Sequence, residues 1–168
     1  MKLFMIYIGG TAGNSNIEVH DIRFVAAENI ENTYPTLKQV WYGNPKSLHL
    51  DSYVVLHNID GYQVELVKEK PNNSEKLYFV NMGGYRNDKL AEQHEFGLFV
   101  AKNSNEAKSQ AKKSLLVGAE ISHKDDLYDV DDCAEVNVDG EQYFVKLTFA
   151  GEAQALVPDW FGYNPIGK

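Results

Sequence analysis

Two stretches of the chain, "EVHDIRFVAAEN" (residues 18–29) and "EQHEFGLFVAKN" (92–103), carry a glutamate, a histidine and an acidic residue at the same places. Sliding the chain by 74 residues also aligns "KLFMIYIGG" (2–10) with "KLYFVNMGG" (76–84). The alignment runs without a gap to residue 51 and contains 11 identities in 50 positions. Because the identical residues are chemically unusual and keep a fixed order, we interpret the pattern as an internal duplication.

Each copy begins with two predicted strands. Bulky apolar residues alternate over 2–8 and 76–82, and a Gly-Gly pair follows, where we expect the chain to turn. The second strand, at about 20–27 or 94–101, is rich in Phe, Val and Ile. Together they predict the first half of a small antiparallel sheet in each copy.

A helix and a hairpin complete each predicted unit. Asn29 and Asn103 stand where a helix cap is expected, and Pro35 restricts the first helix to a start near residue 34. The buried helical face is predicted from apolar residues four apart in the second copy and their counterparts in the first: Ala107, Ala111 and Leu115, and Thr33, Leu37 and Trp41. Asp-Gly pairs at 60–61 and 139–140 predict the hairpin turns.

The expected fold is therefore α+β: two tandem β-β-α-β-β repeats with antiparallel sheets, packed with internal pseudo-two-fold symmetry. The first repeat spans 1–70, the second spans 75–150, and an aromatic C-terminal tail spans 151–168. A single helix on a four-stranded sheet of this size would be marginally stable alone, so we expect the two repeats to pack together.

Composition limits the classes of partner. The chain has 168 residues, of which 43% are hydrophobic, and a formal net charge of −8. Its acidity disfavours binding to nucleic acid or to an anionic membrane surface, because both are negatively charged. A single cysteine, Cys133, forms no intramolecular disulfide, which fits a cytoplasmic protein. No stretch of sequence approaches the ~18 apolar residues of a membrane span.

The arrangement of motifs resembles a known family. A strand followed by Gly-Gly, then Glu-x-His-acid before "FVA", then His-x-Asp before a "DG" hairpin is similar to the bacterial family of the domain of unknown function 1543. The resemblance covers about residues 2–67 and 76–148 and implies one unit in each half. It implies no activity.

Four of the five histidines fall on equivalent positions of the two copies, each beside acidic residues. If the fold brings them together, they form a ligand set for a divalent ion such as Zn, Mn, Ni or Fe(II), or a general acid–base pair. The alternative is structural, because histidines and acids at strand ends often hydrogen-bond loops and turns. The candidate ligand-binding residues are Glu18, His20, His49, Asp51, Glu92, His94, His123 and Asp125, with His20, His49, His94 and His123 as the candidate metal ligands.

The tail has no counterpart in the first copy. Its aromatic residues Trp160, Phe161 and Tyr163 are expected to fold over the core or the junction of the repeats. Otherwise they could anchor a protein partner or a homo-oligomer.

These observations favour a small cytoplasmic binding or regulatory module without turnover, with a small ligand or a protein as its partner. The first alternative is a metal-dependent enzyme that uses the repeated Glu/His and His/Asp positions. The second is a structural protein that assembles through its tail or its sheet edges.

Overall fold

Strand β1 (Lys2–Gly10) buries side chains on both of its faces. In the computed structural model, which describes residues 1–118, the backbone of 121–129, and residues 143–167, Leu3 and Met5 belong to one apolar cluster. Phe4, Ile6 and Ile8 belong to another. Because successive side chains of a strand point to opposite faces, β1 lies between two separate cores.

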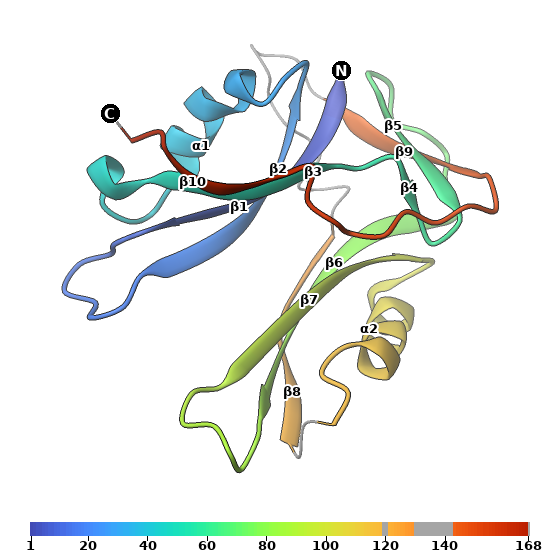
Figure 1. The fold of residues 1–168 in the computed structure, drawn as a ribbon. Helices are drawn as coiled ribbons and strands as arrows, with labels where there is room; N and C mark the ends of the chain where they lie inside the picture. Colours follow the sequence, from blue (N-terminus) through green and yellow to red (C-terminus); the bar gives the residue numbers. More distant parts are fainter. Residues whose placement is uncertain (119–120, 130–142, 168) are drawn as a thin grey trace.

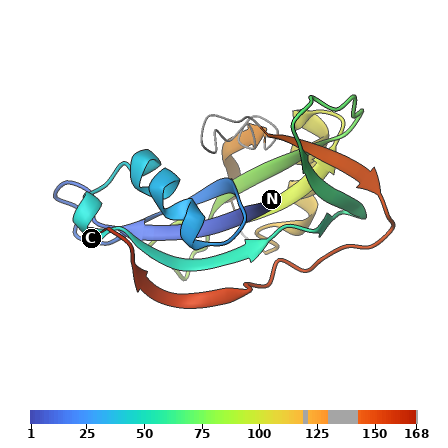
Figure 2. The same cartoon turned by 90° about the horizontal axis from the view of Figure 1, so that it is seen from above.

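The first sheet has the strand order β10-β3-β1-β2, and its pairs are all antiparallel (Figure 1). It contains β2 (Val19–Ala27), β3 (His49–Val55) and β10 (Trp160–Pro165) beside the central β1. Seen from above, β10 runs along the outer side of β3 (Figure 2). The C-terminal segment is therefore the edge strand of the sheet built by the N-terminal half of the chain.

The second sheet repeats the same core arrangement with the order β7-β6-β8. Its strands are β6 (Lys76–Tyr85), β7 (Gln93–Ala101) and β8 (Ile121–Asp129), again antiparallel. As in the first sheet, the first strand of the copy lies between the second and the third.

One helix follows the second strand of each copy. Helix α1 (Tyr34–Val40) begins at the predicted place beside Pro35, after a 3₁₀ turn at Glu31–Thr33. Helix α2 (Ser104–Ser114) begins after Asn103, whose side chain accepts a hydrogen bond from the Glu106 N–H as predicted. The predicted helical faces are buried: Thr33, Leu37, Trp41, Ala107, Ala111 and Leu115.

A third sheet joins the two halves of the chain. The hairpin of β4 (Asn58–Ile59) and β5 (Tyr62–Val67) turns at Asp60 and Gly61, whose φ angles of 49° and 84° suit a two-residue turn. Strand β5 pairs with β9 (Phe144–Phe149) of the second half. The expected four-stranded sheet in each unit is therefore corrected: β5 leaves the first sheet, and β10 takes a place in it.

The layers follow from the cores. One apolar cluster lies between the first two sheets and includes Met5 and Phe24 from one, Phe79 and Leu98 from the other, and Val64 of β5. Helices α1 and α2 cover the outer faces of the first and second sheets, through Leu37 and Ala107 among others. The predicted α+β class is confirmed, with several antiparallel sheets and two helices.

The Gly-Gly pairs do not turn the chain. Strands β1 and β6 continue through them, and Gly9 and Gly83 are paired on both sides. The expected turn was wrong: both strands keep their pairing through the glycines, and Gly9 allows the close approach of side chains that is described below.

Within the described residues, none of the helices has the length and apolarity needed to cross a bilayer. The predicted hairpin turn at 139–140 and Cys133 lie outside the described part of the chain.

Candidate metal centre

Gly9 lies at the centre of the candidate site. It is paired with His20 of β2 on one side and with His49 of β3 on the other, so both imidazoles project from the same face of the sheet. A Cβ atom at Gly9 would lie 2.7 Å from His49 Nε2, 2.8 Å from His20 Cδ2 and 2.9 Å from an oxygen of Asp51. Only glycine leaves enough room for these three side chains to meet.

Two carboxylates complete the group. Glu18 comes two residues before His20, so the two side chains lie on the same side of the chain. Asp51 is the extra residue of a β-bulge, because Tyr7 pairs with Ser52 and the next residue, Ile8, pairs with Leu50. A bulge redirects a side chain, and here it accompanies the approach of Asp51 to both histidines.

The four side chains converge closely. His49 Nε2 lies 3.2 Å from both Glu18 Oε1 and Asp51 Oδ1. His20 Nε2 lies 3.5 Å from Asp51 Oδ2 and 3.7 Å from Glu18 Oε2. The candidate residues of the first copy therefore form one cluster.

His49 is the buried anchor of this cluster, with only 2% of its side chain exposed. Its Nδ1 lies 2.9 Å from the carbonyl oxygen of Ser47. A carbonyl oxygen only accepts, so Nδ1–H is the donor, and in the neutral ring the lone pair of Nε2 faces the two carboxylates. The ring of Tyr163 from β10 packs against the imidazole, with the ring centroids 4.5 Å apart.

An unprotonated nitrogen facing carboxylate oxygens is electrostatically unfavourable unless a cation or a proton lies between them. Bonds of about 2.0–2.2 Å from tetrahedral zinc to nitrogen or oxygen place neighbouring ligand atoms about 3.3 Å apart. His49 Nε2 lies 3.2 Å from one oxygen of each carboxylate, close to that value, whereas His20 Nε2 lies 3.7 and 3.5 Å from the other oxygens of Glu18 and Asp51. Ligand atoms of Glu18, His20 and His49 all lie within 4.8 Å of one another, and Asp51 approaches both histidines. Imidazoles and carboxylates suit zinc and also accept Mn, Ni or Fe(II).

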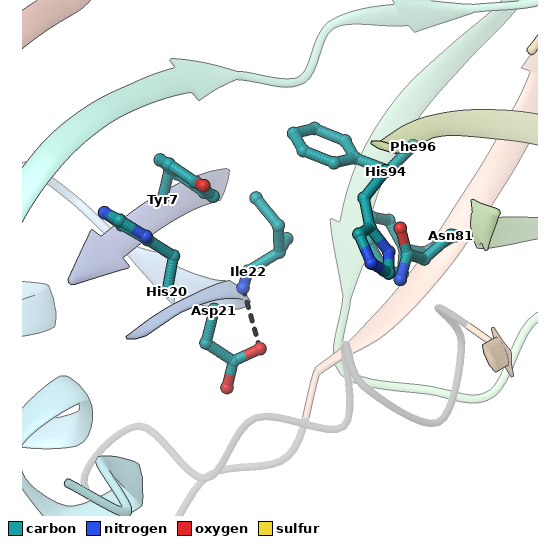
Figure 3. Close-up of a pocket in the computed structure, with 8 residues that line it drawn as sticks. Tyr7, His20, Asp21, Ile22, Asn81, His94 and Phe96 are labelled. Carbon is teal, nitrogen blue, oxygen red and sulfur yellow. Dashed lines mark hydrogen bonds between the residues drawn. The ribbon is translucent and has the colours of Figure 1, made fainter. Parts of the chain in front are cut away.

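The environment of the site raises the pKa of two side chains, Asp51 and Tyr7. Burial raises the pKa of the Asp51 carboxyl, and the two histidines oppose this rise only partly. Burial, with help from the charges of Asp51 and Glu18, raises the pKa of Tyr7, so its phenol stays neutral. Tyr7 is therefore a packing neighbour rather than an anionic ligand, and its ring stacks on His20 with the centroids 5.0 Å apart (Figure 3).

The second copy shows the same backbone arrangement. Gly83 is paired with His94 and with His123, and Asp125 occupies the bulge position equivalent to that of Asp51. Glu92 approaches His94, with an Oε2 to Nε2 distance of 3.6 Å. The side chains of His123 and Asp125 lie outside the described residues, so their candidate roles stay predictions.

Sequence reasoning missed four contributors to the site: Gly9, Ser47, Tyr7 and Tyr163. Only Gly9 had a signal, because the Gly-Gly pair recurs at the same point of both copies. Ser47 acts through its backbone, and Tyr7 and Tyr163 have no aromatic equivalent 74 residues away.

Comparison with known proteins shows the family of the chain. A search of curated proteins found no match. Among solved structures, the chain is similar to the crystal structure of protein Il1583 from Idiomarina loihiensis. The two are 41% identical, the match covers 98% of this chain and 97% of that one, and the TM-score is 0.76. The model of the Domain of Unknown Function DUF1543 matches residues 15–66 and 89–139, which include every candidate site residue. The chain therefore belongs to the DUF1543 family.

Proposed function

We propose that the protein is a metal-binding module in which Glu18, His20, His49 and Asp51 hold one divalent ion. The observation that carries the proposal is the orientation of His49. Its Nδ1–H is committed to the Ser47 carbonyl, while its Nε2 lies 3.2 Å from two carboxylate oxygens. A backbone carbonyl that orients the ring in this way is typical of metal-ligating histidines.

The competing interpretation is a purely structural ion-pair cluster in which the imidazoles are protonated. It accounts for the distances, and it needs the same room beside Gly9 for His20, His49 and Asp51. The two interpretations differ in one measurable respect, because only a metal site gains stability from added metal.

The test is a zinc titration by calorimetry of tag-free, chelator-treated protein, followed by metal analysis after dialysis. We expect one tightly bound ion per chain, a higher melting temperature with zinc, and loss of both effects in the double variant His20→Ala/His49→Ala. His57 is the fifth histidine and is exposed outside the cluster, so His57→Ala is the matched control. Absence of binding across Zn, Mn, Ni and Fe(II), or equal binding by the double variant, contradicts the proposal.

We also infer that the two copies are related by a pseudo-two-fold axis and that the module works in the cytoplasm. The shared register around Gly9 and Gly83, and a bulge at the equivalent aspartates, support the first inference. The single cysteine and the acidic composition support the second.

A further inference from the structure

A pocket of about 440 Å³ lies between the first and second sheets, beside the metal centre (Figure 3). Its volume falls within the range of about 300–1,000 Å³ that is usual for small-molecule sites. The proposed metal function does not use this pocket, although His20 belongs to both.

The two walls of the pocket come from equivalent places of the two copies. Tyr7, His20 and Ile22 stand on one wall, and the residues 74 positions later stand on the other. Those counterparts are Asn81, His94 and Phe96. Figure 3 shows Tyr7, His20 and Ile22 on one side of the space between the sheets and Asn81, His94 and Phe96 on the other. The pocket is therefore a product of the duplication rather than an irregularity of one surface loop.

Aromatic rings form much of the wall. Phe96 lies between Tyr7 and Phe79, at centroid distances of 6.1 and 5.8 Å. A smaller hollow of about 140 Å³, which Tyr7 and Phe96 also line, adjoins this pair. Such rings accept the flat face of another ring, which favours a planar ligand.

The polar groups favour a ligand that is neutral and forms hydrogen bonds. Asn81, His20 and His94 place polar atoms on both walls, and the two histidines also contact carboxylates, His20 those of Glu18 and Asp51 and His94 that of Glu92. Asp21 is already engaged, since it pairs with Arg23 and accepts a hydrogen bond from the Ile22 N–H. Glu18 and Glu92 beside the two histidines disfavour an anion.

We propose that this pocket binds a neutral planar heterocycle with hydrogen-bonding edge groups, of the size of a nucleobase or a pyridine carboxamide. The ring lies against Tyr7 and Phe96, and its edge groups meet Asn81, His20 and His94. Binding needs no metal, so it can be measured separately from the proposed metal function.

The test uses chelator-treated protein titrated with adenine, uracil and nicotinamide, followed by protein-observed NMR. Two analogues of nicotinamide test separately whether the ligand must be neutral and whether it must be aromatic. Nicotinate adds a negative charge, and cyclohexanecarboxamide removes the aromatic ring. We expect at least one heterocycle to bind in the millimolar range or tighter, and both analogues to bind about tenfold more weakly than nicotinamide if nicotinamide is that ligand.

Variants locate the binding and separate it from metal binding. Phe96→Ala and His94→Ala should each weaken the heterocycle about tenfold, and Phe96→Ala should leave zinc binding intact. His49→Ala should abolish zinc binding and leave the heterocycle bound. Phe161 is 79% exposed on β10 and does not belong to the pocket lining, so Phe161→Ala is the matched aromatic control.

Failure of all three heterocycles to bind at millimolar concentration overturns the proposal, even if zinc binds. Binding that survives both Phe96→Ala and His94→Ala unchanged, or a preference for nicotinate over nicotinamide, also overturns it. Heterocycle binding without zinc binding supports the pocket and contradicts the metal proposal alone.

Discussion

The two copies place a Glu–His pair at the same register but in different surroundings. In the first copy, His20 is 34% exposed and is joined by the buried His49 and by Asp51. In the second copy, His94 is 49% exposed beside Glu92. The outer edge of β3 is covered by β10, which brings Tyr163 onto His49. In the part of the chain that the structure describes, no strand covers the outer edge of β8.

Both copies therefore contain the candidate ligand residues. Strand β10, which has no counterpart in the first copy, adds the contact of Tyr163 with His49. Burial strengthens electrostatic interactions and fixes side-chain orientation. We therefore expect the first copy to be the stronger metal site.

The largest effect is expected from removing β10. Deletion of residues 160–168 takes Ile166, which is 5% exposed, out of the core and removes the pairing with β3. We expect the free energy of unfolding to fall by more than about 3 kcal/mol, as judged from the cost of emptying a buried isoleucine site. Urea denaturation measures it, and Phe161→Ala, which stays within about 0.5 kcal/mol of the wild type, is the control.

An unchanged unfolding free energy after the deletion would mean that β10 does not stabilise the first sheet. Sedimentation of the same variant also tests the prediction that Trp160, Phe161 and Tyr163 mediate a homo-oligomer. A change in mass is expected if they do.

The next effect concerns the buried histidine. His49→Ala removes a metal ligand and should weaken zinc binding at least about 100-fold, since loss of an outer-shell partner alone costs 10–100-fold. His123→Ala changes the counterpart of His49 in the second copy, 74 residues later, and should leave the tight binding event unchanged. Calorimetry compares the two variants, and equal losses would show that the copies contribute alike.

A smaller effect is expected at the glycines. Gly9→Ala brings a methyl group within 2.9 Å of three site residues and should weaken zinc binding about tenfold by spreading the ligands. Gly83→Ala makes the same change in the second copy and should leave the affinity unchanged. Circular dichroism first establishes that both variants are folded. If Gly9→Ala binds zinc as tightly as the wild type, the room that Gly9 leaves for the three side chains is not needed for metal binding.

The smallest effect depends on pH. Because burial raises the pKa of Asp51 above 3.8, the folded state holds that proton more tightly than the unfolded state. Its contribution to stability is therefore present below pH 3.8 and lost as the pH rises through the raised pKa. Without metal, Asp51→Asn should be more stable than the wild type above this range, by less than about 1 kcal/mol.

Zinc should reverse that order, because the ion stabilises a carboxylate but not an amide ligand of the same shape. The wild-type affinity for zinc should also rise with pH through the raised pKa of Asp51, since bound metal and bound proton compete. Thermal melts from pH 4 to pH 8, with and without zinc, measure both effects. If Asp51→Asn is less stable than the wild type at pH 7 without metal, the predicted stabilisation by this substitution is wrong.

The sequence by itself determined the repeat, the α+β class, the helix at Pro35, the cap at Asn103 and the turn at Asp60 and Gly61. These depend on local geometry or on a period along the chain, which single residues encode. It also aligned Glu18, His20, His49 and Asp51 as one candidate set, because their counterparts recur in order.

Only the tertiary structure decided how those parts meet. Pairing of β5 with β9, addition of β10 to β3, and the approach of Tyr163 to His49 join residues 77 to 116 positions apart, and no local propensity specifies such partners. Gly9 illustrates the limit. Its recurrence in the second copy was visible in the sequence, but its role, leaving a gap for three converging side chains, exists only once three strands lie side by side.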